Sequence, residues 1–168
     1  MQSMDDLFYA VLQDVYAAER EQLGMLATLA ERSTNATLKL AFRDHEDETL
    51  EQVARLEEVF EIIGREPRAR SSDAMAAIVA EARRITAETQ DGAVRDAGMV
   101  AACQAVEHYE IARYATLLAW AEHLGEDDVI DLLSETLEEE RHADELLSSI
   151  AEGGVNATAS ERPAAADA

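Results

Sequence analysis

The feature of this sequence that most restricts its fold is an internal repeat at a constant offset of 91 residues. The segment EREQLGMLATLAE, residues 19–31, aligns with EIARYATLLAWAE, residues 110–122, and the same offset continues without a gap into a second segment. The matched pairs are Glu19 with Glu110, Leu26 with Leu117, Ala30 with Ala121, Leu38 with Val129, Phe42 with Leu133, Glu48 with Glu139, Leu56 with Leu147 and Val59 with Ile150. Because one shift aligns both segments, the chain is predicted to contain two copies of one hairpin, related by a pseudo-twofold axis.

The spacing of apolar residues predicts that both segments of each copy are helices. Apolar side chains recur every three or four positions along four long stretches, residues 4–32, 36–63, 93–124 and 127–152. A shorter helix is predicted from Ser72 or Asp73 to about Thr89, between the two hairpins. No stretch shows the alternation that is typical of a strand. We therefore predict an all-α four-helix bundle of two helical hairpins, with a short extra helix in the connection.

The length of the chain predicts a single domain over residues 1–154. A chain of 168 residues with 48% hydrophobic content supplies enough apolar side chains for one core. The last stretch, residues 155–168, reads VNATASERPAAADA and lacks both periodicity and large apolar side chains. It is predicted to be a disordered tail.

The charge and cysteine content exclude several classes of function. A net charge of -22 repels nucleic acid phosphates, so no nucleic acid partner is expected. No apolar run approaches the ~20 residues that span a bilayer, and acidic residues stand where a signal peptide is basic. The single cysteine, Cys103, excludes an intrachain disulfide and fits a reducing compartment. These observations predict a cytoplasmic protein that does not enter a membrane.

The basic residues are unusual, since Lys39 is the single lysine and 13 of the 14 basic residues are arginine. An acidic, lysine-poor surface is typical of proteins from a high-salt cytoplasm, where screening reduces the repulsion between acids. A GC-rich genome would also favour arginine over lysine. Salt adaptation is therefore one hypothesis for the composition, with genome composition as its alternative.

Four glutamates coincide with the apolar stripes of the long helices, namely Glu19, Glu48, Glu110 and Glu139. The pseudo-twofold axis would bring them together in the bundle, where four anions in a low dielectric repel by several kcal/mol unless cations or protons intervene. A divalent metal is the simplest solution. Carboxylate-rich sites with an occasional imidazole suit iron or manganese, and zinc competes for the same ligands.

Three further side chains extend this predicted metal site. Glu107 lies three residues before Glu110, and His45 lies three residues before Glu48. The sequence Glu139-x-x-His142 matches the Glu-x-x-His element of di-iron carboxylate bundles. The predicted ligands are Glu19, His45, Glu48, Glu107, Glu110, Glu139 and His142. The alternative for His45 is a hydrogen bond to a neighbouring acid, and for His142 it is a solvated edge position in a run of charged residues. For the four symmetric glutamates it is a buried salt bridge or an edge position reaching water.

Residues 4–152 resemble the YciF-like family of stress-response proteins in the ferritin-like superfamily. The resemblance is carried by LFYAVLQDVYAAEREQL, AFRDHEDETLEQVARLEEVF, VRDAGMVAACQAVEHYEIARYATLLAWAEHLG and LLSETLEEERHADELL. It implies a ferritin-like bundle, a dinuclear metal centre and a homodimer. The pair Glu107-x-x-Glu110 also resembles the third-helix ligand pair of rubrerythrins, which reduce peroxide at a di-iron site. His142 departs from the usual family pattern, whereas His45-x-x-Glu48-Thr49 matches it.

The resemblance and the carboxylates together predict two metal ions per chain, iron in the first place, with manganese or zinc as alternatives. Glu48 and Glu139 are predicted to bridge the two ions, with Glu19 and Glu110 as terminal ligands and Glu107 assisting. The predicted reaction is oxidation of Fe(II) by oxygen or peroxide in stress protection. The alternatives are a non-catalytic metal-binding protein, a structural dimeric bundle whose acids are protonated or paired with arginine, and a manganese catalase. No sequence feature identifies an electron donor.

Overall fold

The computed structural model describes residues 1–161, which fold into seven helical elements. The four long helices are α1 (Met4–Arg32), α2 (Ala36–Ile62), α4 (Gly92–Leu124) and α5 (Asp127–Ile150). The shorter elements are α3 (Asp73–Glu88), the π-helix η1 (Ala151–Val155) and α6 (Asn156–Ser160). No strand is present in this part of the chain. None of its helices combines the length and the apolar character required to cross a membrane.

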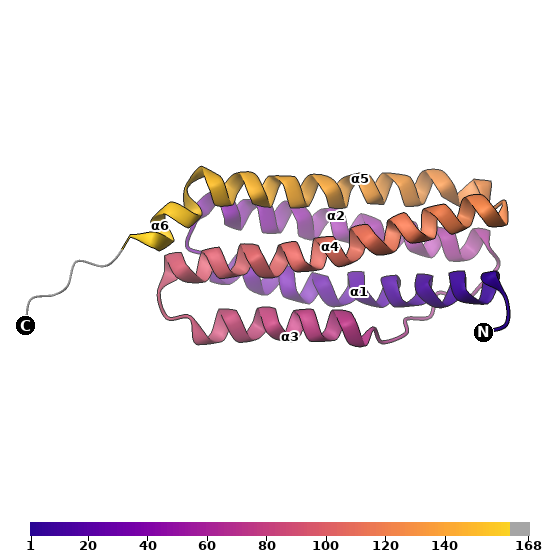
Figure 1. The fold of residues 1–168 in the computed structure, drawn as a ribbon, viewed down its shortest axis with the longest axis horizontal. Helices are drawn as coiled ribbons and strands as arrows, with labels where there is room; N and C mark the ends of the chain where they lie inside the picture. Colours follow the sequence, from indigo (N-terminus) through magenta and orange to yellow (C-terminus); the bar gives the residue numbers. More distant parts are fainter. Residues whose placement is uncertain (162–168) are drawn as a thin grey trace, which may run out of the picture.

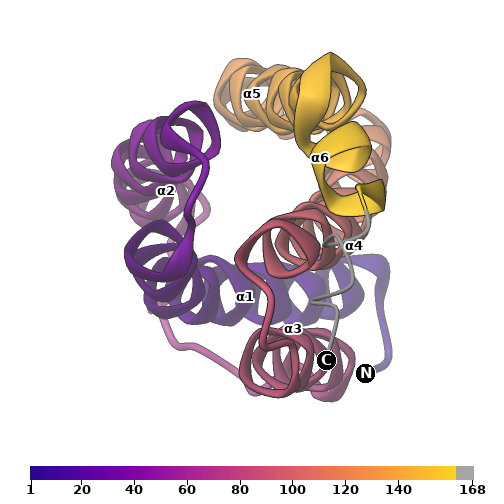
Figure 2. The same ribbon diagram turned by 90° about the vertical axis from the view of Figure 1, so that its left-hand side faces the viewer.

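The long helices form a four-helix bundle made of two hairpins. The first hairpin pairs α1 with α2 and the second pairs α4 with α5, while α2 packs on α5 and α1 packs on α4 to close the bundle. The end view shows these four helices around a common axis, with α3 outside them against α1 and α4 (Figure 2). The ferritin-like bundle and the connecting helix predicted from the sequence are thus confirmed.

The helix ends follow from local sequence. The side chains of Ser3, Asn35, Ser72 and Asp91 each accept a hydrogen bond from a backbone N–H in the first turn of the helix that follows. Gly125 ends α4 in the left-handed conformation, with a φ of 74°, which glycine adopts without steric cost. These ends fix the lengths of the four helices and hence which residues face one another along the bundle.

The C-terminal stretch differs from the sequence prediction of a disordered tail beginning at residue 155. Residues 151–160 continue past α5 as η1 and α6 (Figure 1). Gly154 turns the chain with a φ of 152°. Val155 is buried in the apolar cluster that also contains Met25, Met99 and Leu147. One apolar side chain therefore anchors a segment whose composition suggested none. The rest of the predicted tail, residues 162–168, lies outside the described residues.

The apolar interior is divided into two clusters, one toward each end of the bundle. One cluster contains Met25, Phe42, Met99 and Leu147, and the other contains Leu12, Phe60, Tyr114 and Leu133. Each long helix crosses from one cluster to the other through a short stretch with buried polar side chains. The polar stretches of all four helices therefore meet at the same level, between two water-excluding layers.

A buried carboxylate ties the α1–α2 loop to α4. Asp96 is 2% exposed and accepts hydrogen bonds from the backbone N–H groups of Thr34 and Asn35, at 3.0 and 2.8 Å, and from the Thr34 hydroxyl at 2.6 Å. Because Asp96→Ala would remove all of these hydrogen bonds between the α1–α2 loop and α4, we expect it to lower the free energy of unfolding by about 2–4 kcal/mol. Thermal denaturation would then show a melting temperature about 5–15 °C lower. The exposed Asp131→Ala should leave it within a few degrees of the wild type.

Candidate metal centre

Five ionisable side chains from all four long helices meet in the polar layer. Glu19 comes from α1, His45 from α2, Glu107 and Glu110 from α4, and Glu140 from α5. The four glutamates are 0% exposed and His45 is 6% exposed. Glu107 and Glu110 point the same way because residues three apart lie on one face of a helix.

The five side chains form two groups of three that share one member. Nε2 or Nδ1 of His45 lies within 4.8 Å of carboxylate oxygens of Glu107 and Glu140, which lie equally close to each other. Carboxylate oxygens of Glu19, Glu110 and Glu140 form a second group within the same limit. Glu140 belongs to both groups. The arrangement thus offers one mixed imidazole and carboxylate site beside one site of carboxylates alone.

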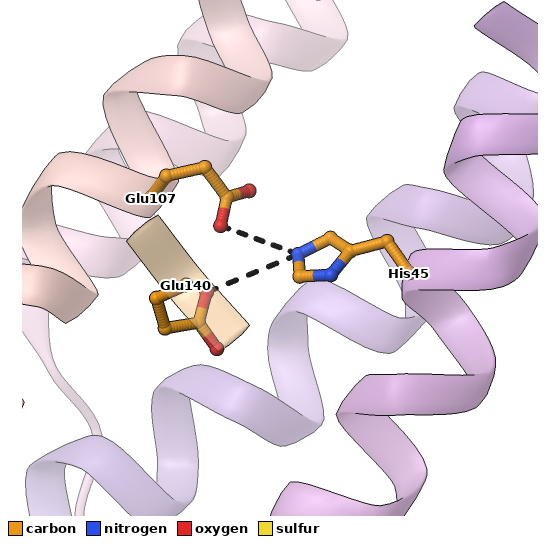
Figure 3. A group of neighbouring side chains, drawn as sticks. All are labelled: His45, Glu107 and Glu140. Atoms are coloured by element: carbon orange, nitrogen blue, oxygen red, sulfur yellow. Dashed lines mark ion pairs between the residues drawn. The ribbon is translucent and has the colours of Figure 1, made fainter. Parts of the chain in front are cut away.

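His45 faces the two carboxylates of its group with one ring nitrogen. Nε2 lies 3.2 Å from Oε2 of Glu107 and 4.0 Å from Oε2 of Glu140, as the dashed lines in Figure 3 mark. Nδ1 lies 3.5 Å from Oε2 of Glu48 on the same helix. Burial alone would lower the pKa of His45, but the charges of Glu107 and its neighbours outweigh this and raise it well above the usual value.

The glutamates divide into one that is held ionised and three that favour the protonated form. Although burial raises the pKa of Glu107, the charge and hydrogen bond of His45 bring it below the usual value. Burial raises the pKa of Glu19 to about 7 against the opposing hydrogen bond from Tyr114. Burial and the charges of nearby carboxylates raise the pKa values of Glu110 and Glu140 well above the usual range. Without a cation, the protein can keep these acids in its interior only by protonating most of them.

Few neighbouring groups satisfy the carboxylates. The Tyr114 hydroxyl donates to Oε1 of Glu19 at 2.6 Å, and Nε2 of Gln22 and Sγ of Cys103 each donate to Oε1 of Glu107 at 3.3 Å. Apart from the contacts of His45 with Oε2 of Glu107 and of Glu140, six other oxygens have no partner among residues 1–161, and they are Oε2 of Glu19, Oε2 of Glu107 and both oxygens of Glu110 and of Glu140. Unsatisfied buried carboxylate oxygens are costly unless a cation or proton occupies the space between them.

The structure brings together four of the seven predicted ligands, Glu19, His45, Glu107 and Glu110. It leaves the other three outside the buried cluster. The Glu48 side chain is 45% exposed, His142 is exposed, and the Glu139 side chain is 24% exposed. The expectation that Glu48 and Glu139 lie on the buried stripes beside Glu19 and Glu110 is therefore wrong, although ligation by any of these residues stays a prediction.

Glu139 is turned toward an arginine instead. Arg55 of α2 donates to both of its oxygens, at 2.8 and 3.0 Å, and also to the hydroxyl of Thr136 at 2.6 Å. Nε2 of Gln52 donates to Oε2 of Glu139 as well, at 3.1 Å. The charge of Glu139 is therefore balanced by Arg55. Arg55 is a partner that the sequence pattern does not predict.

Glu140 is the residue that sequence reasoning missed. It occupies the place that Glu139 was expected to take, one position further along α5. The repeat contains a signal that could have found it, because Glu140 lies seven residues before the core residue Leu147, as Thr49 lies seven before Leu56. At seven residues, two helical turns, a side chain returns to almost the same face. Thr49 is 0% exposed and matches Glu140 at the offset of 91.

The side chains present fit a pair of divalent metal ions. Hard, anionic oxygens with one imidazole are the donors that iron and manganese accept in proteins, and zinc accepts them too. The oxygens without a hydrogen bond lie on the residues that form the two groups, and both oxygens of the shared Glu140 are among them, so this residue could contribute to either group. The apolar layers on both sides exclude competing water.

Comparisons with known proteins give consistent matches over nearly the whole chain. Residues 3–160 match the family model described as domain of unknown function (DUF892). The protein YciF of Escherichia coli K12 is 39% identical over 163 residues, which are 96% of this chain and 98% of that protein.

Solved structures agree with this assignment. The crystal structure of the E. coli stress protein YciF superposes with a TM-score of 0.89 at 39% identity, covering 93% of this chain and 99% of that one. YcfI of Rhodopseudomonas palustris, for which a structural role has been suggested, gives a TM-score of 0.87 at 41% identity over 88% of this chain and 94% of that one. A Xanthomonas campestris protein gives 0.75 at 26% identity over 92% and 95%. The chain therefore belongs to the YciF family of the ferritin-like superfamily, which shares the DUF892 domain.

Proposed function

We propose that this protein binds two divalent metal ions in the interior of its bundle and uses them in redox chemistry with oxygen or peroxide. The observation that carries the proposal is the set of six oxygens without a hydrogen bond on four fully buried glutamates. Ionised carboxylates whose oxygens lie within 4.8 Å of one another repel strongly in a low dielectric, and two divalent cations would neutralise all four glutamates.

Each of the two groups of residues would bind one ion. His45, Glu107 and Glu140 would hold one ion, and Glu19, Glu110 and Glu140 the other, so that Glu140 bridges them. Tyr114 and Gln22 orient Glu19 and Glu107 through the hydrogen bonds they donate. Such outer partners fix the direction of a ligand and tune its basicity. Bound iron or manganese would supply electrons, one from each ion, to an oxidant.

One observation favours a second candidate, metal binding with little turnover. All four glutamates are 0% exposed, so an oxidant and an electron donor have no direct contact with them from solution. A protein of this kind would hold or sequester metal rather than cycle it. The two candidate functions use the same ligands and differ in how fast the bound metal is oxidised and reduced again.

Rapid mixing separates these candidates. Protein loaded anaerobically with Fe(II) is mixed with oxygen or with hydrogen peroxide while absorbance reports oxidation of the iron. We expect peroxide to oxidise both ions within seconds and the cycle to repeat when a reductant is present. A single oxidation that takes many minutes would reject the catalytic proposal in favour of metal binding. Release of oxygen from peroxide by the manganese form alone would identify a catalase reaction.

A further inference from the structure

A pocket between α2 and α5 leads from the surface to the candidate metal centre. It has a volume of about 160 Å³ and is lined by Ala41, Asp44, His45 and Glu48 of α2 and by His142 and Ala143 of α5, among others. His45 also belongs to the buried cluster. Its imidazole therefore separates the pocket from the inner carboxylates.

The side chains that line this pocket include oxygen and nitrogen donors that can bind a divalent cation. The carboxylate of Glu48, whose side chain is 45% exposed, lies 3.5 Å from Nδ1 of His45. His142 adds a second imidazole across the pocket, and Asp44 adds another acid. These are oxygen and nitrogen ligands of the same kinds as those inside.

A second, independent observation points to a ligand here. His45 is 6% exposed, and its Nδ1 has no hydrogen-bond partner among the described residues. Its Nε2 is engaged with Gln22 and Glu107 on the inner side, at 3.1 and 3.2 Å. One ring nitrogen, Nδ1, thus lies on the side of the pocket acid Glu48, and the other, Nε2, lies on the side of the inner carboxylates.

We propose that this pocket is the route by which divalent cations enter the bundle, with Glu48 and His142 as the outer ligands and His45 as the gate. The proposal rests on the proposed metal centre. It also accounts for Glu48 and His142, which the sequence places beside the metal site and the structure places outside its buried part. Small side chains at Ala41 and Ala143 leave room for the cation between the two helices.

The test compares the rate of metal uptake with the final occupancy. Two variants change the pocket, Glu48→Gln by removing its charge and Ala41→Leu by narrowing the space. Glu58→Gln is the matched control, because it removes the same charge from the same helix ten residues away, about 15 Å along α2. Stopped-flow mixing of metal-free protein with Co(II) follows uptake by visible absorption, and elemental analysis after desalting gives the occupancy.

We expect both pocket variants to load at least about fivefold more slowly than the wild type and Glu58→Gln, since charge at a narrow mouth raises the local cation concentration. All four proteins should reach about two ions per chain. Equal rates in all four would overturn the proposed route. A lower final occupancy in Glu48→Gln would also overturn it, because Glu48 would then be a ligand of the inner centre. If the wild type binds no metal at all, the proposed function itself fails.

Discussion

Replacing Glu140 by glutamine is expected to abolish binding of both metal ions while leaving the metal-free fold at least as stable as the wild type. Glu140 is common to both groups of ligands, so one substitution removes an anionic ligand from each. Changes to partners outside the first layer of ligands lower metal affinity by about 10- to 100-fold, and loss of a shared ligand should exceed that. Isothermal titration with Mn(II) and with Zn(II) would measure the loss.

The stability of the metal-free variant makes this prediction specific. Both oxygens of Glu140 lack hydrogen-bond partners in the described structure, and its ion pair with His45 is long, at 4.0 Å, so a neutral amide of the same shape removes a buried acid without removing a hydrogen bond. We expect an unchanged or higher melting temperature. If Glu140 served only to hold the bundle together, the variant would melt lower and metal binding would fall only as far as folding does.

Glu139→Gln is the matched control, since it makes the same chemical change one residue away on the same helix. It weakens the ion pair with Arg55, whose side chain is only 10% exposed and which keeps Glu135 as a second acid, and should reduce stability by about 1–3 kcal/mol. Metal occupancy should stay at about two ions per chain. If Glu139→Gln loses metal and Glu140→Gln keeps it, the ligand set predicted from the sequence is right and the one drawn from the structure is wrong.

The second large effect is a reversal in how stability depends on pH when metal is bound. In the metal-free protein the pKa values of Glu19, Glu110 and Glu140 are raised, to about 7 for Glu19. The stability associated with such a group is complete below the unfolded pKa, near 4.5, and is lost as the pH rises through the folded pKa. The contribution of His45, whose pKa is also raised, is lost in the same direction above its unfolded value of 6.5.

Glu107 has a lowered pKa and acts in the opposite direction, but its contribution changes only as the pH falls toward and below 4.5. We therefore expect the metal-free protein to melt about 5–10 °C lower at pH 7.5 than at pH 5.5. The metal-loaded protein should instead melt higher at pH 7.5, because protons compete with the metal for the carboxylates at the lower pH. Calorimetry in the presence of chelator or of Mn(II) measures both slopes.

Glu110→Gln is the control for this prediction. It removes one buried titrating acid, and neither oxygen of that acid has a hydrogen-bond partner among residues 1–161. The melting temperature of the metal-free variant should therefore depend less steeply on pH than that of the wild type. High salt distinguishes the contribution of buried groups from that of surface charges. At 1 M the screening length is about 3 Å, so interactions between exposed charges are weakened, whereas buried groups are affected far less. A metal-free slope that vanishes in high salt would assign the effect to the surface charge of -22 rather than to the centre.

The sequence predicts the fold well because the fold depends on periodicity. Each of the four long segments has apolar residues at regular helical spacing, among them Leu26, Leu38, Leu117 and Val129, and this identifies four helices. Caps such as Asn35 and Asp91 mark where two of the helices begin. The repeat adds the pairing of hairpins. It does not show that Val155 folds back into the core, since a single apolar residue after two glycines carries no periodic signal.

The candidate site is predicted less completely because several adjacent acids compete for the same place. In the run Glu138-Glu139-Glu140, neighbouring side chains point about 100° apart, and only one can face the interior. Glu139 and Glu140 both lie three or four residues from Thr136 and from Ala143, so helical spacing allows either of them on the buried face. Long-range partners decide between them: Arg55 of α2 holds Glu139 at the edge, and Glu140 joins the buried groups of His45, Glu107, Glu19 and Glu110. The predicted homodimer stays a prediction.

Metal content shows directly whether the buried glutamates hold metal ions. The protein is purified without added metal or nickel resin, analysed for iron, manganese and zinc, and analysed again after anaerobic addition of Fe(II) and desalting. We predict about two ions per chain in the wild type and fewer than about 0.2 in Glu140→Gln, as expected for a ligand shared by two sites. Wild-type protein that stays empty after Fe(II) addition would contradict the account, and the buried glutamates would then be protonated groups within a purely structural bundle.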